Sequence, residues 1–271
     1  MGARKCLEFG ERINVAINGR KRAYLAEMGI DVWERRGLGS AAAESGASED
    51  KAVAEDASEV AREAASVAVA RPVAVGAGDH SARVAAMDWD DLTQAVSVCT
   101  RCALHEGRTQ TVFGVGNRQA EWMVIGEAPG AEEDRQGEPF VGRAGKLLNA
   151  MLQAIGLERE SVYIANILKC RPPGNRDPKP EEEKACRDFL ERQIRLVKPK
   201  IILAVGRIAA QNLLRVDTPI GKMRGRKYEY QDLGIPVIVT YHPAYLLRSP
   251  LEKRKAWTDL LYAKSVVAGG A

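Results

Sequence analysis

Apolar and polar residues alternate in blocks from residue 88 to the end of the chain. Apolar residues recur at helical spacing in several blocks, which predicts helices over 88–98, 142–155, 180–196, 207–214 and 250–264. Other runs are continuously apolar, as in strands buried on both faces, at 122–126, 161–166, 200–206 and 235–240. This alternation predicts an α/β fold, a three-layer α/β/α sandwich with a mostly parallel central sheet. Residues 108–117 are expected to form a loop and an edge strand, and residues 226–230 an accessory hairpin arm.

The first 87 residues follow a different pattern. Residues 20–36 carry Tyr24, Leu25 and Met28 at helical spacing, which predicts a short amphipathic helix. Such a helix could dock on the protein's own domain or bind a protein partner. Residues 37–87 contain no Phe, Trp or Tyr and are rich in Ala, Ser and Glu, so they bury too little apolar area to offset the entropy of ordering. Three parts are therefore expected: a short amphipathic N-terminal segment at 1–36, a flexible linker at 37–87 and a folded domain at 88–271.

Composition narrows the class of protein. No apolar run is long enough for a membrane span, and the N-terminus lacks the apolar stretch of a signal peptide, so we expect a cytoplasmic monomer. The net charge of +4 falls mainly after residue 87. A mildly basic domain suits a polyanion such as DNA, although an ordinary solvated surface can have the same balance.

Cysteine spacing indicates a metal site. Five cysteines without a secretory signal favour metal binding or a catalytic thiol over disulfides. Cys99 and Cys102 form a C-x2-C pair, and Cys170 and Cys186 follow later in the chain. Two residues between thiolates allow one loop to present both sulfurs to a single ion or cluster. Four cysteines suit zinc and a [4Fe–4S] cluster alike, so ligand type alone does not choose between them.

The segment that follows the apolar run at 122–126 predicts an active-site loop. The run ends in glycines, a proline and carboxylates, and a helical pattern opens near Val141. In open α/β sheets, ligands bind at the carboxyl ends of such strands because the loop backbone there is held rigidly.

Four motifs in this order resemble the iron–sulfur uracil-DNA glycosylases of family 4, over roughly residues 88 to 264. They are Gly126-Glu127-Ala128-Pro129-Gly130, Glu138-Pro139-Phe140-Val141-Gly142, the segment from Asn166 to Pro173, and His242-Pro243-Ala244. The resemblance implies the same α/β/α fold and favours a structural [4Fe–4S] cluster, with zinc as the alternative. It also implies an enzyme that flips uracil out of single- or double-stranded DNA. Hydrolysis of the N-glycosidic bond would then leave an abasic site, the first step of base excision repair.

The resemblance also assigns roles in binding the flipped base. Phe140 would stack on it, Asn166 would meet uracil O4 and N3–H, and His242 would hydrogen-bond uracil O2 as negative charge develops there. Ala128 stands where the better-known uracil glycosylases have an aspartate, which leaves the residue that activates water open. We expect Glu127 in that role, with Glu133 as second choice or as a wall against the thymine methyl group.

DNA contacts are expected from two groups of side chains. The segment from His242 to Arg248 combines a turn, bulky apolar residues and a cation, so Leu246, Leu247 and Arg248 are candidates for filling the gap left by the flipped base. Basic residues near the loops are candidates for phosphate contacts: Arg143, Lys146, Lys169, Arg171 and Arg176.

The sequence allows three alternative functions to be compared with base release. A related group traps its product through a histidine in the region that corresponds to residues 170–180, and that segment contains no histidine here. A non-catalytic iron–sulfur module that binds DNA damage would explain the missing aspartate. Electron transfer through a cluster alone would leave Phe140, Asn166 and His242 unexplained.

Overall fold

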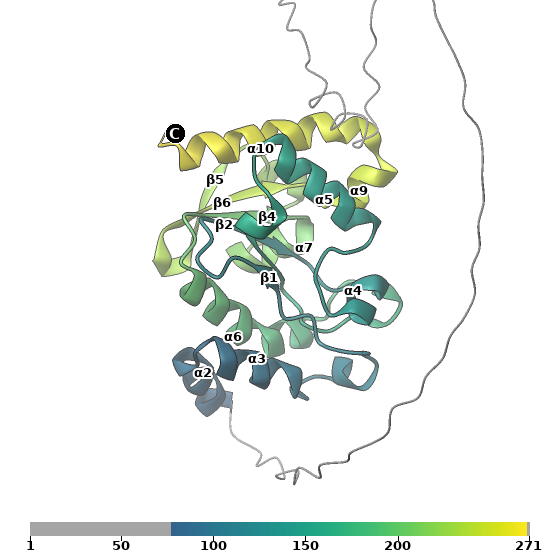
Figure 1. Cartoon of the computed structure of the whole chain (residues 1–271), viewed down its shortest axis with the longest axis vertical. Helices are drawn as coiled ribbons and strands as arrows, with labels where there is room; N and C mark the ends of the chain where they lie inside the picture. The colour runs from purple at the N-terminus through teal and green to yellow at the C-terminus, as the bar shows by residue number, and fades with distance from the viewer. Residues whose placement is uncertain (1–76, 270–271) are drawn as a thin grey trace, which may run out of the picture.

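The computed structural model describes residues 77–269, and a six-stranded sheet runs through this part between layers of helices (Figure 1). The strand order is β1-β3-β2-β4-β6-β5. The four central strands are parallel, and the two edge strands β1 and β5 are antiparallel to their neighbours. The strands are β1 (Val115–Gly116), β2 (Trp122–Gly126), β3 (Tyr163–Asn166), β4 (Ile201–Val205), β5 (Lys227–Tyr230) and β6 (Ile235–Thr240).

The five predicted helices lie close to their predicted ranges, and the three-layer α/β/α fold is confirmed. Asp88 caps the first of them, because its side chain accepts hydrogen bonds from the backbone N–H groups of Asp90 and Asp91. These helices are α3 (Trp89–Ser97), α5 (Arg143–Ala154), α6 (Pro180–Val197), α7 (Arg207–Leu214) and α10 (Lys253–Val267).

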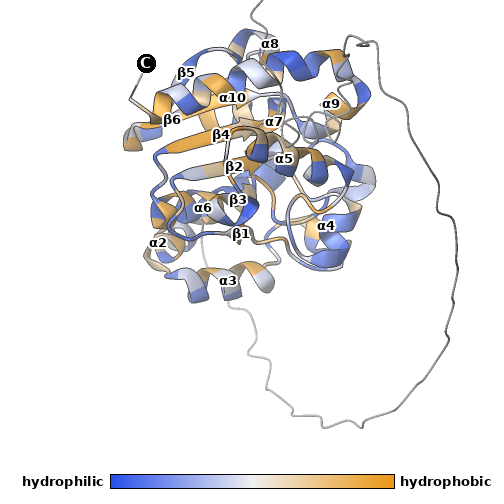
Figure 2. Cartoon of the chain, turned by 45° about the horizontal axis from the view of Figure 1, so that its top comes forward, coloured by the Kyte–Doolittle hydropathy of each residue, from blue (hydrophilic) through white to orange (hydrophobic). Residues whose placement is uncertain are grey.

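Successive strand side chains point to opposite faces of the sheet, and each face packs under its own helices. Met123 and Ile125 of β2 belong to the cluster with α6 and α7, whereas Trp122 and Val124 belong to the cluster with α5 and α10. Figure 2 shows the apolar strands between the two helical layers. Within residues 77–269, no helix combines the length and the apolar character needed to cross a membrane.

Some elements differ from the prediction. Helix α2 (Ala77–Ala86) lies within the range predicted as linker, and its Val84 is buried against Phe189 of α6. The linker prediction is therefore wrong for these residues, while residues 1–76 lie outside the described part. Residues 227–230 are an edge strand of the main sheet, because β5 pairs with β6.

Short helices near the ends of the strands were not predicted. They are α4 (Ala131–Gln136), α8 (Ile220–Met223), α9 (Pro243–Arg248) and the 3-10 turns η1 (Ala103–Glu106), η2 (Arg159–Ser161), η3 (Pro173–Asn175), η4 (Gln231–Leu233) and η5 (Pro250–Glu252). Helix α9 occupies the segment predicted as a turn after His242.

Candidate active site

The predicted motifs meet at the carboxyl edge of the central strands. Gly126, the last residue of β2, pairs in register with Asn166, the last residue of β3. His242 lies two residues beyond the end of β6, which is separated from β2 by β4 in the sheet. A Cβ atom at Gly206, which follows β4, would lie 3.1 Å from the Cβ of His242. We call Gly126, Phe140, Asn166 and His242 the edge site.

Gly126 is where Phe140 and Asn166 converge. A Cβ atom at this position would lie 2.5 Å from Oδ1 of Asn166 and 2.6 Å from Cζ of Phe140. Asn166 is only 2% exposed, and its Oδ1 has no hydrogen-bond partner among residues 77–269. A buried amide oxygen without a partner is costly, so the edge site is suited to a ligand that supplies a donor.

Phe140 is held in an unusual backbone conformation. Its φ is +55°, in the left-handed region that non-glycine residues seldom adopt. Helix α5 approaches so closely that a Cβ at Gly145 would lie 1.8 Å from the carbonyl oxygen of Phe140. The ring centroid of Phe140 lies 5.6 Å from that of His242 with 32° between the planes. The strained turn therefore sets one aromatic ring beside the other.

His242 is a neutral hydrogen-bond donor at physiological pH. Its Nδ1 accepts a hydrogen bond from the backbone N–H of Ala244 at 3.2 Å, so the proton of the neutral ring is on Nε2. Burial lowers the pKa of His242 to about 4, and the nearby charge of Arg248 adds to the effect while Glu133 opposes it. The ring can therefore donate from Nε2 without carrying a charge.

Glu127 is a half-buried carboxyl group at the start of the loop. Burial raises its pKa to about 7, with a further rise from Asp177 and Glu183 and an opposing effect from Arg207. Its backbone carbonyl accepts a hydrogen bond from the N–H of Leu168, which fixes the loop to the end of β3. Near neutral pH this carboxyl group can therefore gain or release a proton. Ala128 packs against the apolar cluster under α6 and α7.

Glu133 holds the loop together. Its Oε2 accepts a hydrogen bond from Gly130 N at 3.1 Å, and its Oε1 accepts from Val141 N and Gly142 N at 3.0 and 3.1 Å. Three backbone donors occupy the carboxylate, so the expectation that Glu133 activates water is not supported by its contacts. Glu133 therefore connects Gly130, which precedes α4, with Val141 and Gly142, which follow it.

Two of the predicted DNA contacts are wrong, because their side chains are inside the protein. Lys169 is 1% exposed, and its Nζ donates to the carbonyl of Asn166 at 2.9 Å and to Oε1 of Gln193 at 2.6 Å. Leu246 is also 1% exposed, because α9 turns it into the core beneath α5.

The remaining candidates stay accessible to different degrees. Leu247 is 37% exposed, and Arg143, Lys146 and Arg248 are exposed. Arg171 and Arg176 are half-buried; Arg171 bonds Asn175, and Arg176 forms a two-pronged pair with Glu182 at 2.6 and 2.9 Å. Leu251, which is not among the predicted DNA contacts, is 93% exposed in η5 just after α9.

Four cysteines from three segments lie near one another, and we call them the cysteine site. Burial raises the pKa values of Cys102, Cys170 and Cys186. Cys99 raises the pKa values of Cys102 and Cys170 further, and Cys102 and Cys170 raise that of Cys186. None of the four forms a disulfide in the described part of the chain. Among residues 77–269, no three His, Cys, Asp or Glu side chains are arranged as they stand to hold a metal ion.

Two cations face the cysteine site. Nη1 of Arg108 donates to Sγ of Cys170 at 3.1 Å and to the carbonyl of Cys99 at 2.8 Å. Burial lowers the pKa of Lys169 to about 7, and the charges of Cys186 and Cys170 oppose this change. Arg108 is half-buried and Lys169 is fully buried, and buried basic groups are stabilised as cations by nearby negative charge. The four thiols and these two basic side chains therefore fit an anionic group held by thiolates.

The fold and the edge site together define a doubly wound α/β protein whose strand ends bring together an amide, an aromatic ring and a neutral histidine. The profile of the Uracil DNA glycosylase superfamily matches residues 113–263, more than half of the chain. The chain belongs to this superfamily.

The chain is also similar in sequence to individual uracil-DNA glycosylases. The chain is 50% identical to a type-4 uracil-DNA glycosylase of Archaeoglobus fulgidus over 176 residues, which are 63% of this chain and 88% of that protein. It is 44% identical to a type-4 uracil-DNA glycosylase of Thermotoga maritima over 179 residues, 65% of this chain and 93% of that protein. A type-5 uracil-DNA glycosylase of Thermus thermophilus is 35% identical over 118 residues, 38% of this chain and 53% of that protein.

Proposed function

We propose that this protein releases uracil from DNA by hydrolysing the bond between the base and its deoxyribose. The observation that carries the proposal is the unpartnered Oδ1 of the buried Asn166, set beside the ring of Phe140 at Gly126. An edge site with one flat apolar wall and one unpaired amide matches a flipped pyrimidine base. The abasic site that remains is the substrate for the later steps of base excision repair.

Asn166 supplies the selectivity for uracil. Its amide oxygen accepts the N3–H of uracil, and its amide nitrogen donates to O4. Cytosine has an acceptor at N3 and a donor at N4, so it would leave buried groups on both sides unpaired. Unpaired buried groups of this kind give discrimination of several orders of magnitude.

His242 stabilises the leaving base. As the glycosidic bond breaks, negative charge develops on uracil O2, and the N–H of His242 Nε2 is the donor that meets it. The low pKa of His242 keeps this ring neutral, so it donates a hydrogen bond to the base without transferring a proton to it. A preorganised donor of this kind contributes on the order of 3–4 kcal/mol to catalysis.

Glu127 is the carboxylate that orients the attacking water. Its ionised form also balances the positive charge that develops on the sugar. Because burial raises its pKa to about 7, both the ionised and the protonated form are present near neutral pH. Glu133 acts on the reaction indirectly, by fixing the loop that carries Glu127 and Phe140.

DNA is held and opened by side chains beyond the edge site. Leu247 and Leu251 are the accessible apolar residues near α9 and are suited to fill the gap left by the flipped base. Arg143 and Arg248 are exposed cations that meet phosphates.

Cys99, Cys102, Cys170 and Cys186 hold a [4Fe–4S] cluster, with zinc as the alternative. When bound, the group supplies a structural cross-link and negative charge, and no step of the reaction passes through it. Arg108 and Lys169 support this assignment, because their charges face the thiols. Lys169 also connects the cysteine site to Asn166 through the Asn166 carbonyl.

The test is release of free base from three oligonucleotides that differ only in one position, which is uracil, thymine or cytosine. The proposal predicts free uracil and an abasic site from the first and neither product from the other two. Stable binding to uracil-containing DNA without base release would favour the non-catalytic module. The type-4 relatives are named as glycosylases and give that alternative no support.

A further inference from the structure

The turn at Phe140 is held from two sides by charged side chains of opposite sign. On one side, Glu133 accepts hydrogen bonds from the N–H groups of Val141 and Gly142. On the other side, Arg159 of η2 donates from Nη2 to the carbonyl of Pro139 at 2.6 Å and from Nη1 to the carbonyl of Phe140 at 3.3 Å. The peptide groups on both sides of the Phe140 Cα are therefore fixed by charge-assisted hydrogen bonds.

Arg159 is itself anchored to α5. Its Nη1 lies 3.2 Å from Oδ1 of Asn149, so one guanidinium links the turn to the helix that begins after it. Burial lowers the pKa of Arg159, and Glu138, Glu160 and Glu133 oppose this shift. A guanidinium remains charged under these conditions, so its donors stay directed at the two carbonyls.

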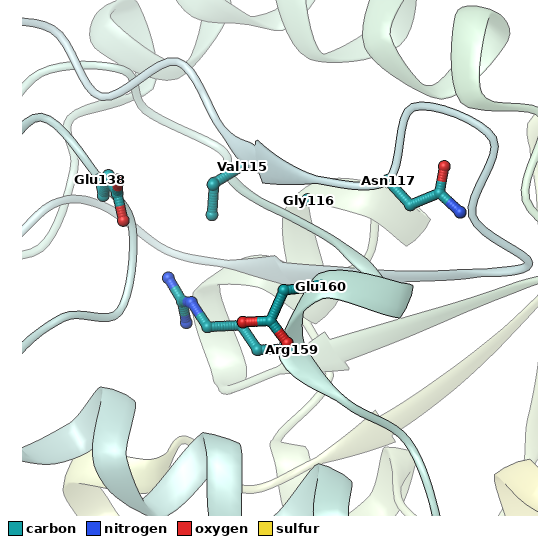
Figure 3. Close-up of a pocket in the computed structure, with 6 residues that line it drawn as sticks. All are labelled: Val115, Gly116, Asn117, Glu138, Arg159 and Glu160. Carbon is teal, nitrogen blue, oxygen red and sulfur yellow. The ribbon is translucent and has the colours of Figure 1, made fainter.

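Figure 3 shows Arg159 beside the edge strand β1, in an open cleft of about 600 Å³. The other lining residues include Glu138 and Glu160, whose carboxylates would repel a phosphate in this cleft. Phosphate binding is thus a poor explanation for Arg159. Its contacts instead support a backbone conformation with a φ of +55°, which Phe140 would leave readily without them.

We propose that Arg159 is a positioning residue that holds the Phe140 ring in place for stacking on the flipped base. The functional part of this inference rests on the proposed release of uracil. Arg159 does not touch the base in this account; it acts through the carbonyls of Pro139 and Phe140. Arg159 lies outside the four sequence motifs and follows α5 as an ordinary charged residue.

The first arm of the test measures the turn directly. Hydrogen–deuterium exchange is followed in peptides that cover residues 138–146, in wild type, Arg159→Met, Arg159→Lys and the control Arg195→Met. Arg195 is an exposed arginine on α6, on the opposite side of the sheet from α5. We expect exchange in this segment to rise about tenfold in Arg159→Met, to rise less in Arg159→Lys, and to stay unchanged in the control. Unchanged exchange in Arg159→Met would overturn the proposal.

The second arm is a double-mutant cycle on uracil release from a single-uracil oligonucleotide. If Arg159 acts through Phe140, Arg159→Met should raise KM about tenfold with kcat changed less than about threefold, since loss of stacking weakens base binding. Phe140→Ala should have at least the same effect, and the double variant should match Phe140→Ala alone. Arg159→Lys should recover part of the loss.

Three results of the second arm would contradict the inference. Multiplicative effects in the double variant would indicate that Arg159 and Phe140 act independently. A lowered kcat at unchanged KM would indicate a general loss of folded enzyme. A loss in Arg159→Met that disappears at low salt would indicate a phosphate contact. If wild type releases no uracil, the proposed function fails, and the exchange arm alone still decides whether Arg159 positions the turn.

Discussion

The edge site and the cysteine site both bury polar groups, but they differ in what those groups need. In the edge site, Asn166 has an unpaired neutral acceptor and His242 is a neutral donor. In the cysteine site, the cations Arg108 and Lys169 face thiols whose pKa values are raised by burial. The edge site therefore needs a neutral hydrogen-bonding ligand, whereas the cysteine site needs negative charge.

This difference separates ligand binding from structural support. A flipped base can enter and leave the edge site because each hydrogen bond that it forms is modest. An anionic group facing buried cations is costly to remove, since uncompensated charge would remain inside the protein. Single substitutions in either site should therefore have separable effects on uracil release and on stability.

A large effect on catalysis is expected for His242→Ala. Removing the neutral donor should lower kcat for uracil release by about 10² to 10³-fold, since the developing charge on O2 loses its partner. Single-turnover release at enzyme excess measures this directly. KM should change little, and a loss confined to KM would mean that His242 binds the ground state.

Gly126→Ala should lower kcat/KM by about 10²-fold. The new methyl group would lie 2.5 Å from Asn166 Oδ1 and 2.6 Å from the Phe140 ring, so both must shift away from the base. Gly221→Ala is the matched control, because a Cβ there meets nothing within 4 Å. Equal activity in both variants would show that the space at Gly126 is not needed for binding the base.

The substitution Cys186→Ser should mainly lower the stability of the folded protein. If the proposed [4Fe–4S] cluster is bound through Cys186, loss of this ligand should release the cluster and lower the midpoint of thermal unfolding by on the order of 10 °C. Iron and brown colour carried by the wild type should then be lost together. Cys6→Ser, at the remaining cysteine, should keep both, and a stable, active, iron-free Cys186→Ser variant would contradict the structural role of the cluster.

The pH dependence should give the smallest effect. Burial raises the pKa of Glu127 to about 7, and the ionised carboxylate is the active form. The single-turnover rate should therefore rise about tenfold from pH 6 to pH 8 with its midpoint near 7. Glu127→Gln should remove this dependence, while the exposed Glu229→Gln should keep it. A rate that falls with rising pH would mean that the protonated form acts.

Much of the fold could be predicted from sequence, because its strands are continuously apolar and its main helices have clear periodicity. The range predicted for α7 agrees with the structure residue for residue, and that for β2 does too. The start of the domain was placed too late, since Val84 of α2 becomes buried only in a cluster that includes Phe189 of the distant helix α6. A contact over such a distance in sequence leaves no local signal.

In the candidate site, too, residues in local motifs could be predicted, whereas residues placed by tertiary packing could not. Phe140, Asn166 and His242 could be predicted from motifs, and the structure brings them together. Lys169 and Leu246 were assigned to the surface by residue type and neighbouring motif, but tertiary packing turns both inward. Arg159 could not be predicted, because its role depends on carbonyl groups that only the folded turn brings within reach.

The central claim is that the amide of Asn166 recognises uracil for excision. The most direct measurement is single-turnover release of uracil by wild type and by Asn166→Asp, with the thermal midpoints of both compared. The account predicts release by wild type and a fall of about 10³-fold in the variant at similar stability, because a carboxylate repels uracil O4 and cannot donate to it. A variant that releases uracil within tenfold of wild type would contradict the account.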